Sequence, residues 1–162
     1  MRILGVDPGL RATGFGLVEV VKAGRIKIID AGSIEPDPKA LFENRIAKVH
    51  HLLSEIIDTH KPHVLVLEKL YAHYKHPTTA CLLGHVRGVI CLLAHEHKVQ
   101  LTEASVKRIR QALIGNGNAT KEQVQMFVKR LLNIESVKLS LDTSDALAFA
   151  LGHAHMLKFK LL

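Results

Sequence analysis

Three segments typical of β-strands follow one another within the first 33 residues, and this arrangement constrains the fold more than any other feature. They span residues 2–7, 13–21 and 25–33, and turn signals separate them, Asp7-Pro8-Gly9 and Gly24. Connections this short join antiparallel neighbours, because a parallel pair needs a crossover of about a dozen residues or more. The chain is therefore expected to begin with an antiparallel meander.

The rest of the chain alternates helical and extended segments. Apolar spacing predicts helices over residues 39–60, 77–98, 104–114, 121–132 and 143–157, and strands at residues 63–68 and 99–102. Either Asn118 or Thr120 caps the helix at 121–132. The order predicts an α/β fold, a mixed five-stranded sheet with helices on both faces. We expect a single domain over residues 1–162.

The helix predicted over residues 77–98 is apolar around almost its whole circumference. Such a helix must be covered on every side, and the sheet covers only one. We expect a symmetric homodimer through this helix; a wholly internal helix is the alternative. No uninterrupted apolar stretch reaches about 18 residues, so no membrane span is expected.

Charge and cysteine content bear on partners and compartment. The formal net charge of +7 favours a polyanionic partner, above all nucleic acid, although a solvated basic surface is the alternative. Cys81 and Cys91 are ten residues apart on one predicted helix, about 15 Å, which is too far for a disulfide. We expect both to be reduced core residues, as is usual in the cytoplasm. The eleven histidines form no zinc-binding spacing with them.

Four acidic residues stand where the predicted elements would bring them together. Asp7 and Glu68 close two strands, and strand ends in such sheets gather in one crevice. Asp142 and Asp145 are three residues apart at a helix start, so they share one face. Crowded carboxylates repel unless a divalent cation such as Mg²⁺ or Mn²⁺ neutralises them. Two such ions about 4 Å apart would activate water for phosphodiester cleavage.

Most of these acids also have a simpler explanation when taken alone. Asp7 can be a turn residue, Glu68 a solvated charge at a strand end, and Asp142 a helix cap. Asp145 is harder to explain in this way, because it precedes Ala-Leu-Ala on a helix facing the core. The metal-site prediction therefore depends on the four residues together.

Five ordered motifs resemble those of the crossover (Holliday) junction endodeoxyribonuclease RuvC family, and they extend over almost the whole chain. They lie at residues 3–16, 67–71, 83–88, 115–121 and 142–148. The resemblance implies a ribonuclease-H-like fold and paired, symmetrical nicks in four-way junction DNA during homologous recombination and repair. It implies action alongside the branch-migration proteins RuvA and RuvB. It also implies two Mg²⁺ ions per site, replaceable by Mn²⁺, held by the catalytic acids Asp7, Glu68, Asp142 and Asp145.

Four residues are expected to contact DNA: Tyr71, Lys107, Arg110 and Lys121. The resemblance implies that Tyr71 stacks on unpaired bases, worth about 1–3 kcal/mol per base; alternatively it covers loop and core. The basic stretch at residues 107–110 would face phosphates, or form a solvated helix face. Two positions depart from the family pattern. Arg110 replaces a lysine, which keeps the charge but not the compact ammonium, and His76 replaces an asparagine.

Three other functions fit parts of the sequence. An ATP-binding domain of the sugar-kinase or actin type also opens with Asp-x-Gly, but that class needs two such domains and gives Asp142 and Asp145 no role. A module that binds junctions without cutting them would not need all four acids. A related nuclease of the same fold would act on RNA or on another branched DNA, because fold does not fix substrate.

Overall fold

The computed structural model describes residues 1–21, 25–70 and 77–158, and five of its strands form one sheet in the order β3-β2-β1-β4-β5. The strands are β1 (Arg2–Asp7), β2 (Thr13–Val20), β3 (Ile26–Ile34), β4 (Val64–Glu68) and β5 (Gln100–Ala104). β1, β2 and β3 pair antiparallel, as the short connections predicted, whereas β4 runs parallel to both β1 and β5. The predicted mixed five-stranded sheet is confirmed.

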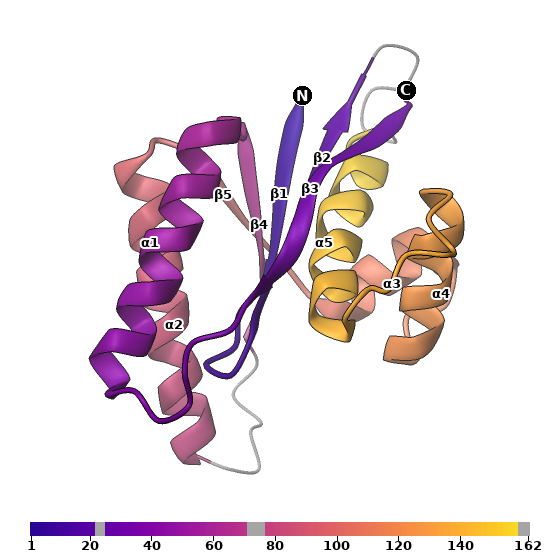
Figure 1. Cartoon of the computed structure of the whole chain (residues 1–162). Helices are drawn as coiled ribbons and strands as arrows, with labels where there is room; N and C mark the ends of the chain where they lie inside the picture. Colours follow the sequence, from indigo (N-terminus) through magenta and orange to yellow (C-terminus); the bar gives the residue numbers. More distant parts are fainter. Residues whose placement is uncertain (22–24, 71–76, 159–162) are drawn as a thin grey trace.

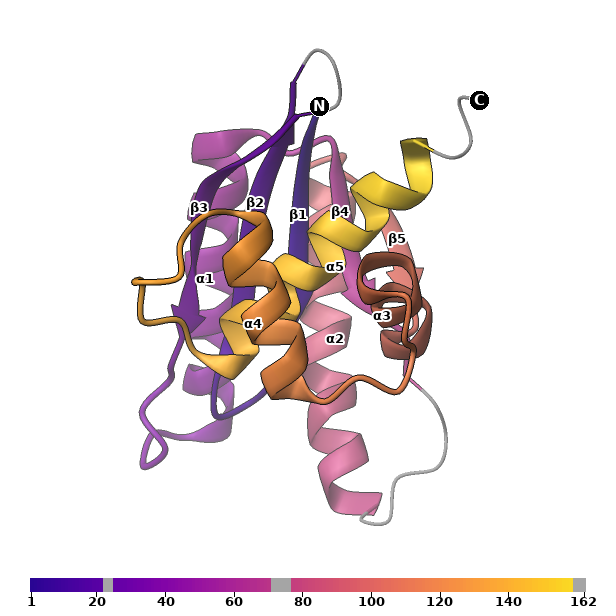
Figure 2. The ribbon, with the colours of Figure 1, turned by 90° about the vertical axis from the view of Figure 1, so that its right-hand side faces the viewer.

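Helices cover both faces of this sheet (Figures 1 and 2). One face carries α1 (Phe42–His60) and α2 (Pro77–Glu96). The other face carries α3 (Val106–Ile114), α4 (Lys121–Leu131) and α5 (Leu141–Lys158), with α5 lying directly across the strands. The predicted α/β class, with helices on both faces, is confirmed.

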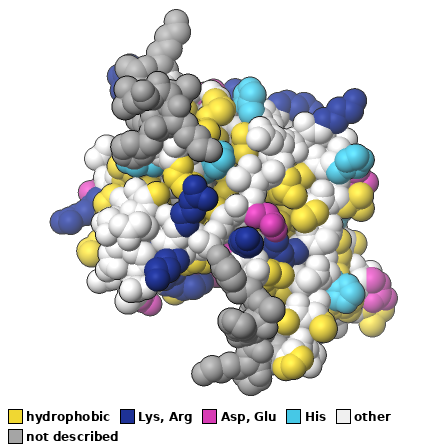
Figure 3. Space-filling model, turned by 180° about the vertical axis from the view of Figure 1, so that it is seen from behind, with side chains coloured by type: hydrophobic (Ala, Val, Ile, Leu, Met, Phe, Trp, Pro, Cys, Tyr) yellow, Lys and Arg dark blue, Asp and Glu magenta, His cyan; other side chains and the backbone are white. Residues whose placement is uncertain are grey.

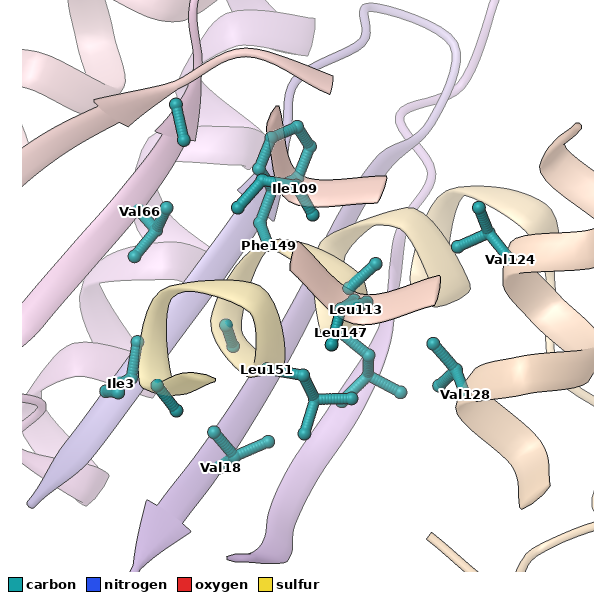
Figure 4. Close-up of a cluster of buried hydrophobic side chains, with 14 of the residues drawn as sticks. Ile3, Val18, Val66, Ile109, Leu113, Val124, Val128, Leu147, Phe149 and Leu151 are labelled. Carbon is teal, nitrogen blue, oxygen red and sulfur yellow. The ribbon is translucent and has the colours of Figure 1, made fainter. Parts of the chain in front are cut away.

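The central strand β4 is apolar on both of its faces because both faces are covered. Leu65 and Leu67 are fully buried in the cluster beneath α1 and α2. Val64 and Val66 belong to a second cluster beneath α3, α4 and α5, where Figure 4 shows Val66 in the same group as Ile109. This two-sided burial explains the continuous apolar run in the sequence.

Glycines let α5 approach the sheet closely. A Cβ atom at Gly5 of β1 would collide with the backbone carbonyl of Ala146, and one at Gly14 of β2 would collide with that of Asp142. The first turns of α5 therefore rest directly against the strands, so that acidic side chains of this helix are held near the end of β1.

Two predicted boundaries need correction. α1 begins at Phe42 rather than at residue 39, because the carbonyl of Asp37 first accepts a hydrogen bond in a turn. β5 extends to Ala104, where a helix was predicted to begin. α3 begins only after Ser105, whose Oγ accepts the backbone N–H of Arg108 at 3.2 Å and so caps the helix.

The side of α2 that faces away from the sheet is exposed and largely uncharged. Leu92 is 51% exposed, and added Cβ atoms at Gly84 and Gly88 would meet nothing within 4 Å. Cys81 is exposed here, so its predicted place in the core is wrong; Cys91 is half-buried, and both thiols are free. By length and composition alone, α2 passes as a candidate membrane span, contrary to expectation, with 28% of its apolar stretch buried.

Candidate active site

Asp7 and Glu68 lie at the same end of the sheet because β1 and β4 are parallel neighbours. The start of α5 brings Asp145, which is only 9% exposed, to the same place. These three residues line one cavity of about 150 Å³. The structure therefore gathers acids from three elements that are far apart in the sequence.

The fourth acid, Asp142, joins this group through a lysine. The Nζ atom of Lys121 lies 3.9 Å from Oδ1 of Asp142 and 2.8 Å from Oδ2 of Asp145. Asp142 does not cap α5, because it lies inside the first turn and the Oγ atom of Ser140 accepts the backbone N–H of Thr143 at 3.1 Å. The capping explanation for Asp142 is therefore wrong.

Lys121 is held in place by the start of α4. Thr120, one of the two predicted caps, accepts the backbone N–H of Gln123 at 3.3 Å, and the Gln123 side chain accepts the N–H of Thr120 at 2.9 Å. Sequence reasoning assigned Lys121 to DNA phosphates. The structure places its ammonium group between carboxylates, where it acts as their internal counter-ion.

Burial and crowding raise the pKa values of the two strand-end acids. Burial is the main cause that raises the pKa of Asp7 to about 7; the Lys121 charge opposes it and the neighbouring carboxylates add to it. Burial, followed by the charge of Asp145, also raises the pKa of Glu68, against the opposing charges of Lys121, Arg87 and Arg110. Burial lowers the pKa of Lys121, but its hydrogen bond and charge interactions with the acids outweigh this and raise it overall.

The donor set fits a hard divalent cation in its chemistry, although not in its present arrangement. Four carboxylates supply the oxygen ligands that Mg²⁺ and Mn²⁺ prefer, and one ammonium group balances them only in part. Across residues 1–21, 25–70 and 77–158, no three acidic, histidine or cysteine side chains stand close enough together to hold one ion. Binding of a metal would therefore require these carboxylates to move closer together, and the ion would compete with the ammonium of Lys121 for Asp145.

Three basic residues, Lys107, Arg108 and Arg110, line part of a second, larger cavity beside the acids. It has a volume of about 1280 Å³, and Glu68, Lys107 and Arg110 line it. Arg110 also lines the smaller cavity and donates a hydrogen bond to the carbonyl of Ala119, while its buried Nε atom has no hydrogen-bond partner in the described part of the chain. Figure 3 shows Lys and Arg side chains around an acidic one near the centre of one face of the molecule. A cavity lined by lysine and arginine side chains suits a phosphate backbone.

Sequence reasoning did not single out Arg87, although it is the one charged residue in the apolar turns at residues 86–94 of α2. Its side chain is 9% exposed, donates a hydrogen bond to the backbone carbonyl of Glu68 and forms an ion pair with Glu103 of β5. Tyr71, a predicted DNA contact, and His76, a departure from the family pattern, lie outside the described residues.

The fold and the site define a class of protein. The sheet is mixed, has the strand order of a ribonuclease-H-like fold, and carries acids at the ends of its central parallel strands. The helix across these strands adds a further acidic pair. The chain is therefore a ribonuclease-H-like α/β protein. The family model described as crossover junction endodeoxyribonuclease RuvC matches residues 3–153. A relative of that description from Rhodopirellula baltica is 39% identical over 152 residues, covering 93% of this chain and 85% of the relative. The chain belongs to the RuvC family of crossover junction endodeoxyribonucleases.

Solved structures support the same assignment. RuvC of Thermus thermophilus is 26% identical, with a TM-score of 0.87 over 99% of this chain and 97% of the other. A structure of T. thermophilus RuvC in complex with a Holliday junction substrate, 24% identical, has the same fold, with a TM-score of 0.87 over 98% and 96% of the two chains. The family resemblance and the ribonuclease-H-like fold predicted from the sequence are confirmed.

Proposed function

We propose that this chain resolves Holliday junctions as a metal-dependent endonuclease, making paired, symmetrical nicks in four-way junction DNA during homologous recombination and repair. Its family membership supports this function. The observation that carries the proposal is the meeting of acids from β1, β4 and α5 around Lys121, next to a cavity that Lys107 and Arg110 help to line.

Each residue of the site has a role in this proposal. Asp7, Glu68, Asp142 and Asp145 would hold Mg²⁺, or Mn²⁺ in its place, with two ions per site. The ions, when bound, supply an activated water and stabilise the leaving oxygen. Lys121 partly neutralises the carboxylates in the metal-free protein, and once the ions bind its ammonium would be free to meet a phosphate oxygen.

The substrate would lie across the larger cavity. Lys107 and Arg110 line it and would contact phosphates, which position a nucleic acid without reading its sequence. Tyr71 would stack on unpaired bases at the crossover, as the family resemblance implies. Junction shape, rather than base edges, would then select the substrate.

We also propose that α2 forms the seam of a homodimer. Its exposed positions Cys81, His85, Gly88 and Leu92 follow the alternating spacing of four and three residues that places side chains along one seam between two helices. Gly84 and Gly88 would let two helices approach closely, since no side chain separates them. A two-fold dimer would present one site to each of two strands of a junction. We place its activity in the cytoplasm, alongside RuvA and RuvB.

Cleavage of a synthetic four-way junction, compared with linear duplex and structured RNA, tests the function. The chain should nick the junction at symmetrical positions with Mg²⁺ and not with EDTA. Asp7→Asn and Glu68→Gln should each reduce cleavage at least about a hundredfold. Junction binding should survive in both variants. Asp58→Asn, an acid of α1 paired with Lys61 and His97, is the control and should cut normally.

Each other result would decide against part of the proposal. Binding without Mg²⁺-dependent nicking would identify a non-catalytic junction binder, and preferential cutting of RNA would identify a different nuclease of this fold. Undiminished cutting by both Asp7→Asn and Glu68→Gln would show that these two acids do not bind a catalytic metal.

A further inference from the structure

We propose that Arg87 is a positioning residue that fixes the carboxyl end of β4, and with it the Glu68 side chain, for metal binding. Its guanidinium group joins α2 to two strand ends, through the carbonyl of Glu68 and the carboxylate of Glu103. This inference rests on the proposed function, because the placement of Glu68 matters for cleavage only if Glu68 binds the metal.

Glu68 needs such support because its backbone is paired on one side only. The register between β1 and β4 ends at Val6 and Leu67. The register between β4 and β5 continues one residue further, to Glu68 and Ala104. On the side away from β5, the sheet therefore gives Glu68 no partner residue, and the hydrogen bond from Arg87 supplies an additional restraint at this point.

The chemistry of arginine suits this task. A planar guanidinium presents several N–H donors in a fixed geometry and can hold two acceptors at once. The ammonium of lysine sits on a flexible chain and does not fix the positions of two acceptors in this way. A buried cation is also expensive unless it is paired, so Arg87 itself has a strong preference for this arrangement. The neighbouring residue, Gly88, lies on the exposed stripe of α2. A displacement of α2 would therefore be transmitted to the backbone of Glu68 by the Arg87 side chain alone.

The chain contains a matched control at the opposite end of the same strand. Arg2 donates to the backbone carbonyl of His60, shortly before β4 begins, at 2.6 Å. It also pairs with Glu19, with 3.3 Å between Nε and Oε1. This arginine thus has the same two kinds of partner, a carbonyl near an end of β4 and a carboxylate, but it lies at the end of the strand away from the acids.

The test compares Arg87→Lys and Glu103→Gln with Arg2→Lys and Glu19→Gln. Mn²⁺ affinity is measured by electron paramagnetic resonance, and single-turnover cleavage of a four-way junction is measured over a range of Mg²⁺ concentrations. Arg87→Lys and Glu103→Gln should weaken Mn²⁺ binding and slow cleavage by about tenfold, within the 10–100-fold range seen for residues that support metal ligands. Higher Mg²⁺ should recover part of the rate, and junction binding should stay unchanged. The two control variants should match the unmodified chain.

Several outcomes would overturn the proposal. Normal Mn²⁺ affinity in both Arg87→Lys and Glu103→Gln, even with a lowered melting temperature, would reduce Arg87 to a structural residue. Equal losses in Arg2→Lys and Glu19→Gln would show that any clamp on β4 has this effect. Because Glu103 is 44% exposed, Glu103→Gln should fold even if changes at Arg87 do not. If the unmodified chain fails to cut DNA, the proposed function fails, while the Mn²⁺ measurement still tests Arg87.

Discussion

At the scale of single residues, Asp7 shows how the site opposes folding when no metal is present. Its pKa is raised from 3.8 to about 7, so at pH 5–7 the folded chain keeps a proton that the unfolded chain releases. Folding stability should therefore fall as the pH rises from the ordinary pKa towards the raised one, and the whole penalty is present above pH 7. A bound cation would remove this penalty, because it stabilises the charged form.

The corresponding prediction is that Asp7→Asn stabilises the metal-free protein. In EDTA the gain should grow between pH 5 and pH 8 and reach up to about 4 kcal/mol, because a shift of one pKa unit corresponds to about 1.4 kcal/mol. Chemical denaturation at the two pH values measures it. Saturating Mg²⁺ should narrow the difference by stabilising the unmodified chain. An Asp7→Asn variant that is less stable than the original chain at pH 8 in EDTA would contradict the raised pKa of Asp7.

The sequence predicted some site residues better than others, for physical reasons. Asp7 and Glu68 could be predicted as site residues because an apolar run in the sequence shows where a strand ends. Parallel neighbouring strands then bring those ends together. The place of Lys121 was missed because it depends on where the capped start of α4 packs against α5. Arg87 was missed because helical periodicity does not say which strand end a given turn will meet.

At the scale of elements, the exposed stripe of α2 leads to a direct test of the dimer. Leu92→Glu would place a charge in the proposed seam, so the variant should be monomeric while remaining folded. Sedimentation or light scattering measures this. Leu131→Glu is the matched control, since Leu131 is 45% exposed on α4, on the other face of the sheet, and its replacement should leave the mass unchanged. A monomeric original chain, or a dimeric Leu92→Glu variant, would refute the seam.

Element types were predictable throughout, whereas several element ends were not. The residues around Ala104 show why. β5 gains its last pair from its partner Glu68, a contact between distant parts of the chain, while the hydroxyl of Ser105 fixes the start of α3 locally. A local sequence pattern can reveal the cap at Ser105 but not the pairing of Ala104 with a distant strand, so the helix was predicted to begin too early.

At the scale of the whole molecule, the net charge of +7 should make junction binding strongly dependent on salt. Lys107→Ala should weaken binding and lower the slope of log K against log salt by about 0.9, the value for one phosphate contact. Lys48→Ala is the control, because Lys48 lies on α1 across the sheet and should not touch the DNA. Equal slopes for Lys107→Ala and the original chain would place the DNA elsewhere.

The strand that carries Glu68 is tied down at both of its ends, by Arg2 near the start and by Arg87 at the finish. Sliding β4 by one position along its neighbours would turn every side chain to the opposite face of the sheet. Its leucines and valines would exchange clusters, and the Glu68 carboxylate would leave the face that it shares with Asp145. Arg87 would then lose the carbonyl of Glu68 as its partner, and the backbone of Arg2 would lose its hydrogen bonds with His63. The two arginines thus penalise such mispairing together, and help to ensure that each folded copy carries its carboxylate on the correct side.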